Sequence, residues 1–243
     1  MFKAADLLAQ GRTAVAEASD RGLALRMMGG IGILARCPSA ESAPLARDYN
    51  DLDFFGLSRD SAALIKMFKE LGYTAENRFN SLHGHRRLLF KADDDQHVDV
   101  LLDHFEMCHK LDLRARLEID AETLTLADLA ITKLQVVEAN DKDLTDTVAL
   151  FADHDVSEDA EVIDSGYIAK ICANDWGLHK TLTNSLERMS QYVATLEGIS
   201  HDTVAARLKK MAEQIDAAPK SRRWKMRARV GERAKWYELP EEV

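Results

Sequence analysis

The sequence predicts an α+β fold, with a mixed sheet and flanking helices in the first half and helices through the second half. Before about residue 122, short apolar segments alternate with a period of two, as half-buried strands do. From about residue 125 the apolar period changes to 3.6, which is typical of amphipathic helices. No proline lies between residues 45 and 218, so none interrupts these patterns.

The first half begins with a predicted amphipathic helix over residues 2–20, which contains one glycine, Gly11. The next elements, in chain order, are strands at 23–28 and 51–56, a helix whose apolar stripe is Leu64, Ile65, Phe68 and Leu71, and strands at 85–91 and 97–103. Ser58 is the predicted cap of that helix and Gly72 its end. The polar segment ADDDQ, residues 92–96, is predicted to be a hairpin turn, and residues 111–120 a further strand.

The second half is predicted to be helical over 125–140 and 142–154, and then in several pieces from 158 to 216. Ser157 and Ser200 are the predicted caps among those pieces. We therefore expect a mixed α/β domain over 1–122, a helical domain over 123–218 and a basic C-terminal tail over 219–243.

The composition is typical of a soluble globular chain. Of 243 residues, 46% are hydrophobic and 30% charged, and no stretch approaches eighteen uncharged apolar residues, so we expect no membrane span. The N-terminus has an acid at position 6 and no long apolar segment, which is unlike a secretory signal. Cys37, Cys108 and Cys172 are far apart and form no CxxC pair. This spacing fits a cytoplasmic protein and gives no sign of a zinc site or disulfide framework.

The charge is distributed unevenly along the chain. The net charge is −9, but residues 219–236 hold eight Lys or Arg and one acid, Glu232, so this segment is +7 and the remainder −16. Interleaved tryptophans make the tail suitable for a polyanion such as tRNA or another RNA. Packing of the tail against the chain's own acidic surface explains the same pattern about as well.

Three acids on two predicted strands are the main candidates for chemistry. Side chains at i and i+2 of a strand share a face, so Asp51 and Asp53 project together, and Asp99 projects from the segment HVDVLLD. If these strands are neighbours, three carboxylates meet on one patch. Two such charges 4 Å apart repel by roughly 4 kcal/mol at an effective dielectric of 20. A cation would relieve this repulsion, and Mg²⁺ suits oxygen ligands best.

The predicted strand at 23–28 ends in Gly29 and Gly30, before a short apolar stretch. Glycines at such a turn let the backbone approach a phosphate, to which exposed N–H groups then donate. Arg47, four residues before Asp51, could steer an approaching triphosphate. The glycine pair and the Asp-x-Asp pair are each common in proteins when taken alone. Their order and spacing together with Arg47 and Asp99 are more specific for a nucleotide site.

These motifs resemble the nucleotidyltransferase fold of the DNA polymerase beta superfamily. More narrowly, they are similar to minimal bacterial nucleotidyltransferases grouped with AbiEii-type abortive-infection toxins. A later segment, ADLAITKLQVVEANDKDLTDTVAL, adds Lys133, Asp143 and Asp146 to the resemblance. Ile31 stands where these proteins often have Ser or Thr after the glycines. The motifs cover residues 22 to about 150.

The resemblance implies that Asp51, Asp53 and Asp99 bind two Mg²⁺ ions beneath a nucleoside triphosphate (ATP or GTP). It implies that Gly29 and Gly30 cradle the phosphates, that Lys133 contacts the triphosphate, and that Asp143 lies near the nucleotide or acts with the acceptor. The expected reaction is transfer of a nucleoside monophosphate to a hydroxyl on an RNA 3′ end, a protein or a small molecule. A toxin-like role with an antitoxin partner is a further implication.

Two other interpretations of the same residues stay open. The chain could be a catalytically silent protein that keeps the fold to bind a nucleotide or RNA. It could also be a helical interaction module in which the acids are incidental. Lys133 could be an ordinary surface lysine of an amphipathic helix, and Asp143 could belong to a solvated helix face.

Overall fold

The computed structural model of the chain describes residues 3–92 and 96–239. They divide into two compact units. The sheet unit comprises the described residues within 1–36, 47–105 and 111–125, and the helical unit those within 37–46, 106–110 and 126–243. The chain thus enters the helical unit twice, briefly, before residue 126. Each unit is described by itself.

The sheet unit is built on a five-stranded mixed sheet in the order β1-β2-β5-β4-β3. Its strands are β1 (Leu25–Met27), β2 (Asp51–Gly56), β3 (Thr74–Ala75), β4 (Arg87–Lys91) and β5 (His97–Leu102). β2 and β5 run parallel, and the other neighbours pair antiparallel. The predicted strands at 23–28, 51–56, 85–91 and 97–103 are confirmed. Asp93–Asp95, on which the predicted hairpin turn falls, lie outside the described residues.

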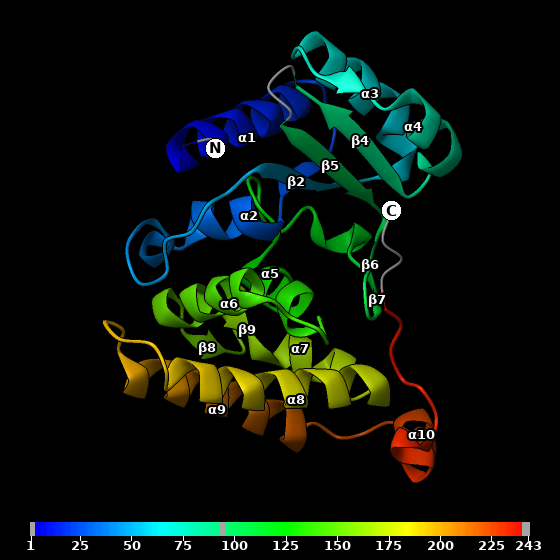
Figure 1. Cartoon of the computed structure of the whole chain (residues 1–243). Helices are drawn as coiled ribbons and strands as arrows, with labels where there is room; N and C mark the ends of the chain where they lie inside the picture. The colour runs from blue at the N-terminus through cyan, green and yellow to red at the C-terminus, as the bar shows by residue number, and fades with distance from the viewer. Residues whose placement is uncertain (1–2, 93–95, 240–243) are drawn as a thin grey trace. The chain divides into compact units, whose positions relative to one another are not determined.

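Helices cover both faces of this sheet. They are α1 (Ala4–Asp20), α2 (Gly29–Arg36), α3 (Ser61–Glu70) and α4 (Asn77–His83). α1 and α3 lie over one face and α2 over the other (Figure 1). The face under α3 is the core: Phe54 and Phe90 are fully buried, and the Phe68 ring lies 5.7 and 4.7 Å from theirs. Burial of such aromatic side chains stabilises this unit most.

Gly11 does not interrupt α1. It is buried, and a Cβ at this position would come 2.6 Å from Met27 Sδ, so the glycine lets the helix approach β1 closely. The predicted helix over 2–20 is confirmed for the residues described.

The helical unit contains α5 (Leu126–Leu134), α6 (Asp141–Asp153), α7 (Ser165–Cys172), α8 (Trp176–Val193), α9 (His201–Ala217) and α10 (Arg222–Val230). Two short strands, β8 (Val156–Ser157) and β9 (Ile163–Asp164), pair parallel. Side chains cap several helices: Asn140 and Asp143 form a reciprocal capping box on α6, and Asp164 and Asp175 cap α7 and α8. The predicted helical second half is confirmed, and so is the α+β class.

The predicted serine caps are not confirmed. The Ser58 hydroxyl donates to Asp103 Oδ2 at 2.6 Å, and a 3₁₀ turn (Ser58–Asp60) precedes α3. Ser157 lies in β8. Ser200 precedes α9, but its side chain bonds Thr203 Oγ1 at 2.8 Å and makes no capping bond to the backbone.

The predicted strand over 111–120 is wrong for most of its length. A two-stranded sheet is formed by β6 (His104–Glu106) and β7 (Lys110–Asp112). β7 ends at Asp112, and a 3₁₀ turn follows at Arg114–Arg116. The Asp112 carboxylate accepts from the Arg114 backbone N–H at 3.2 Å and from Arg114 Nε at 2.9 Å. A local side-chain bond of this kind competes with a strand ladder for the backbone. Within the described residues, no helix is long and apolar enough to cross a membrane.

Candidate active site

Three acids meet on one face of the sheet. In the parallel pair β2–β5, Asp53 lies directly opposite Asp99, and Asp51 lies opposite His97. Neighbouring strands are about 4.8 Å apart, so the Asp53 and Asp99 backbones have roughly that separation. Leu52 and Phe54 point to the opposite face and are fully buried. The predicted convergence of the two aspartate segments is therefore present.

Burial differs among the three acids. Asp51 is exposed, and Asp53 and Asp99 are half-buried, with the Asp99 side chain 20% exposed. Burial raises the pKa of Asp99; Arg87 opposes this shift, and the charge of Asp51 adds to it. A carboxylate whose pKa is raised holds a proton more readily, so Asp99 is a candidate base in this patch.

Arg87 of β4 pairs with Asp99, whereas the sequence favoured an ordinary surface arginine over a phosphate or base contact at this position. Its Nε lies 3.0 Å from both oxygens of Asp99, and its Nη2 lies 2.6 Å from Oδ2. Burial lowers the pKa of Arg87, but the bonds to Asp99 and the charge of Asp53 outweigh it, so the pKa is raised. Strand alternation could have indicated this residue. β4 pairs antiparallel with β5, which places Arg87 on the Asp99 face, one diagonal step away.

The two glycines lie beside the acids at the start of α2. Gly29 has φ +58°, and a Cβ there would overlap the Asp53 carboxylate. A Cβ at Gly30 would overlap the Arg47 guanidinium, which lies 4.1 Å from the Tyr49 ring. First-turn helix amides have no partner within the helix and favour anions. Gly29, Gly30 and Arg47 therefore border the acids, with amides and a guanidinium suited to a phosphate. Ile31, the next residue, is fully buried.

The acids fit magnesium in their chemistry. Carboxylate oxygens are the ligands that this ion prefers, and three carboxylates lie on one face of the sheet. Within residues 3–92 and 96–239, no group of three or more His, Cys, Asp or Glu side chains has the arrangement of a ready-made metal site. Arg87 already engages both oxygens of Asp99, so an ion at Asp99 would have to compete with it.

Lys133 and Asp143 belong to the helical unit, where they form a buried ion cluster with Asp146. Lys133 Nζ lies 2.9 Å from Asp143 Oδ1 and 2.9 Å from Asp146 Oδ2, and Asp146 is 1% exposed. Burial lowers the pKa of Lys133, but the two carboxylates outweigh it and the pKa is raised. A contact of Lys133 or Asp143 with a triphosphate stays a prediction.

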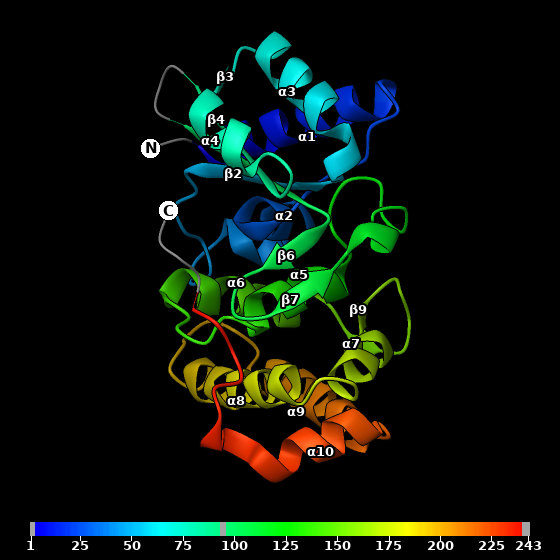
Figure 2. The same cartoon turned by 90° about the vertical axis from the view of Figure 1, so that its right-hand side faces the viewer.

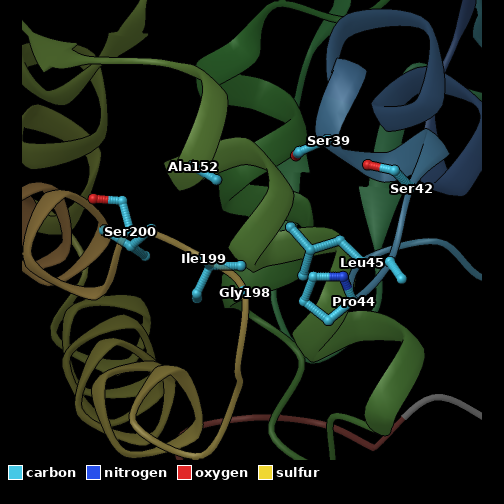
Figure 3. A pocket seen from close by; sticks show the side chains of 10 residues that line it. Ser39, Ser42, Pro44, Leu45, Ala152, Gly198, Ile199 and Ser200 are labelled. Carbon is cyan, nitrogen blue, oxygen red and sulfur yellow. The ribbon is translucent and has the colours of Figure 1, made fainter.

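Three cavities lie elsewhere in the two units. One of about 200 Å³ in the helical unit is bordered by Pro44 and Leu45 on one side and Ile199 on the other (Figure 3). Another, of about 360 Å³, is lined by tryptophans and basic side chains of the same unit. An open one in the sheet unit lies between Ser58 and His85. Asp51, Asp53 and Asp99 line none of these three.

Comparison with known proteins gives a limited result. No family model matches the chain, and no curated protein matches it either. Among solved structures, the chain is similar to the solution structure of the antibiotic-resistance factor ANT(2'')-Ia. The two are 14% identical with a TM-score of 0.39, and the match covers 58% of this chain and 80% of that one. A similarity of this size does not bear on function.

Proposed function

We propose that the chain is a Mg²⁺-dependent nucleotidyltransferase that moves a nucleoside monophosphate from a triphosphate to a hydroxyl acceptor. The observation that supports this most is the register of β2 and β5, which sets Asp53 opposite Asp99 beside the Gly29 turn. A purely structural sheet face gains nothing from facing carboxylates, because they repel. Such a face suits a site that receives cations together with an anionic ligand.

Each group has a proposed role in this reaction. Asp51, Asp53 and Asp99 would hold the two ions, which when bound neutralise charge on the phosphates and the leaving pyrophosphate. Gly29 and Gly30 would donate backbone N–H bonds to phosphate oxygens, and Arg47 would orient the triphosphate. Asp99 would accept the proton of the acceptor hydroxyl as its oxygen bonds the α-phosphorus. The bond from that phosphorus to the oxygen bridging to the β-phosphate breaks, and pyrophosphate leaves.

Arg87 pairs with Asp99 in the protein alone. If the Asp99 oxygens held an ion, the Arg87 guanidinium would be available to donate to a phosphate oxygen. Arg87 would in this way balance the charge of Asp99 in the protein alone and the charge of a phosphate in the complex. Lys133 and Asp143 would act on the triphosphate and acceptor sides, as the resemblance implies. The RNA, antitoxin and toxin-like aspects of the proposal rest on that resemblance and on the basic tail.

The test is transfer of label from α-³²P nucleoside triphosphates with Mg²⁺ to pooled tRNA, protein and metabolites. We expect a labelled acceptor, and a loss of at least about 100-fold in the Asp51→Asn/Asp53→Asn variant, since it removes groups that stabilise the transition state. Asp48→Asn, which removes a nearby exposed carboxylate, should keep full activity.

Two other outcomes would contradict the proposal. Nucleotide binding without transfer to any pool would favour a catalytically silent nucleotide-binding or RNA-binding protein. Failure to bind either nucleotide or Mg²⁺, with the fold intact, would favour an interaction module.

A further inference from the structure

A cleft of about 360 Å³ in the helical unit combines aromatic and basic side chains. We call it the tryptophan cleft. Three segments form it: residues 108–110, the start of α8, and the C-terminal arm that comprises α10 and residues 231–238. Its aromatic residues are Trp176, Trp224, Trp236 and Tyr237, and its basic residues include Lys110 and Arg223. Its volume lies in the range of small-ligand sites.

The arm that forms one wall is fixed to the helical unit. The Ser221 N–H donates to the Ala173 carbonyl at 2.9 Å, and the Glu238 N–H donates to the Cys108 carbonyl at 3.0 Å. Gly177 lets the arm approach closely, because a Cβ there would come 2.6 Å from the Trp236 carbonyl oxygen. Figure 2 shows α10 alongside α8. The cleft is therefore present before any ligand binds.

The aromatic rings are also held in place. The Trp176 and Trp236 ring centroids lie 6.0 Å apart, and those of Trp236 and Tyr237 lie 5.2 Å apart, both edge to face. The Trp236 Nε1–H donates to Thr181 Oγ1 at 3.3 Å. Trp224 Nε1 is buried and has no hydrogen-bond partner in the described chain. A bound ligand with an acceptor atom would satisfy that donor.

The basic residues of the arm are of two kinds. Some brace the arm: Arg227 donates to the Gly231 and Ala234 carbonyls at 2.6 and 2.8 Å, and its guanidinium lies 4.6 Å from the Trp176 ring centroid. Others project from α10 into solvent: Arg222, Arg223, Lys225 and Arg229. The arm holds two acids, Glu232 and Glu238, which are paired with Lys180 at 2.8 Å and with Lys235 at 2.9 Å. The exposed cations of α10 are thus available to an external anion.

We propose that the tryptophan cleft and the exposed face of α10 bind a single-stranded polynucleotide. A base would stack on the aromatic rings, and the phosphates that follow it would run along the cations of α10. Aromatic faces combined with a basic track are the usual means of binding single strands. A duplex fits less well, because its base faces are covered by stacking. The nine residues of α10 span about 13 Å, more than one phosphate occupies, which favours a strand over a free nucleotide.

The proposal is independent of nucleotidyl transfer, because it concerns residues of the helical unit alone. The test is fluorescence anisotropy of labelled single-stranded 12-mers, both RNA and DNA, with the full chain. We expect binding that weakens with salt. Arg222→Gln/Arg223→Gln should reduce the slope of log K against log salt by about 1.4, since each single-strand phosphate contact contributes about 0.7. Lys209→Gln/Lys210→Gln, two exposed lysines of α9, is the matched control and should leave the slope unchanged.

Stacking is tested separately at Tyr237. Tyr237→Ala should weaken binding by about 5- to 100-fold, and Tyr237→Phe, which keeps the ring, should restore it. Circular dichroism checks that both variants fold. Binding of either RNA or DNA strands with this pattern supports the proposal.

Several results would overturn it. One is equal affinity for duplex or heparin together with no effect of Tyr237→Ala. Others are binding of mononucleotides as tight as that of strands, binding of phosphatidylserine vesicles but not of strands, or no binding of strands at low salt.

Discussion

The two units each hold a group of acids beside a basic residue, and the two groups are built differently. In the helical unit, Lys133 lies 2.9 Å from both Asp143 and Asp146, and the cluster is largely buried. In the sheet unit, Asp99 has Arg87, but Asp51 and Asp53 share the same face and Asp51 is exposed. The charges of the helical cluster are paired with one another. The sheet patch places its three acids on one face that is partly open to solvent, where a cation could reach them.

The largest expected effect is the loss of Lys133. Lys133→Met leaves Asp146 buried without its cation, and removing one partner of a buried pair costs about 3–5 kcal/mol. Urea unfolding followed by tryptophan fluorescence measures this, because Trp176, Trp224 and Trp236 all belong to the helical unit. Lys142→Met, an exposed lysine on α6, should change the unfolding free energy by less than about 0.5 kcal/mol. Equal values for the two variants would show that the cluster is not structural.

The next effect concerns Gly29, which borders the sheet patch. Gly29→Ala adds a Cβ at φ +58° that overlaps the Asp53 carboxylate. Gly22 has φ +69° with no atom within 4 Å of an added Cβ, so Gly22→Ala isolates the backbone cost, about 1–2 kcal/mol. We expect Gly29→Ala to lose about 1–3 kcal/mol more, the usual cost of overpacking. Far-UV circular dichroism in urea measures both. No difference between them would mean that Asp53 moves aside without cost.

Much of the sheet patch could be predicted from the sequence, because side chains alternate strictly between the two faces of a strand. The period of two placed Asp51 and Asp53 on one face with Leu52 and Phe54 opposite, and the structure has that arrangement. The same period of two also accounts for the face of β5 on which Asp99 lies. These inferences need only local geometry.

Features set by tertiary contacts could not be predicted in this way. Strand alternation gives the face of β4 on which Arg87 lies, but its pairing with Asp99 depends on the register between β4 and β5. Residues 37–46 belong to the helical unit although they lie between two elements of the sheet unit. One contact that holds them there is the Ser39 N–H bond to Asp153 Oδ2, over a separation of 114 residues. Nothing in the local sequence indicates a contact at that separation.

Acid should destabilise the helical unit through its buried histidines. In the sheet unit, Asp99 acts in the opposite direction to Asp103, Asp112 and Asp120, whose pKa values are lowered. Burial lowers the pKa of His179, and the charge of Lys220 lowers it further, although Asp216 and Asp175 oppose the shift. Burial also lowers the pKa of His109. Below pH 6.5 the unfolded chain therefore binds protons that the folded helical unit does not, and this unit loses stability as the pH falls. Asp99 has a raised pKa, so its protonation favours the folded sheet unit as the pH falls toward 3.8.

Tryptophan fluorescence and far-UV circular dichroism, recorded in urea at pH 7.5, 6.5 and 5.5, separate these contributions. The midpoint reported by the tryptophans should fall with pH, and less so in His179→Gln. A midpoint that rises on acidification would contradict the assignment of neutral, buried histidines.

The smallest effect, and the most direct test of the sheet patch, is expected for Asp53→Asn. The change removes one of the facing charges and also its attraction to Arg87, so without metal the free energy of unfolding should differ from that of the wild type by no more than about 1 kcal/mol. With millimolar Mg²⁺, the wild type should gain thermal stability and the variant should not, because an ion that binds only the folded state raises its stability. Asp48→Asn should gain like the wild type. Marked destabilisation of the metal-free variant would mean that Asp53 is a structural residue, and the contrast between the two acid groups would then disappear.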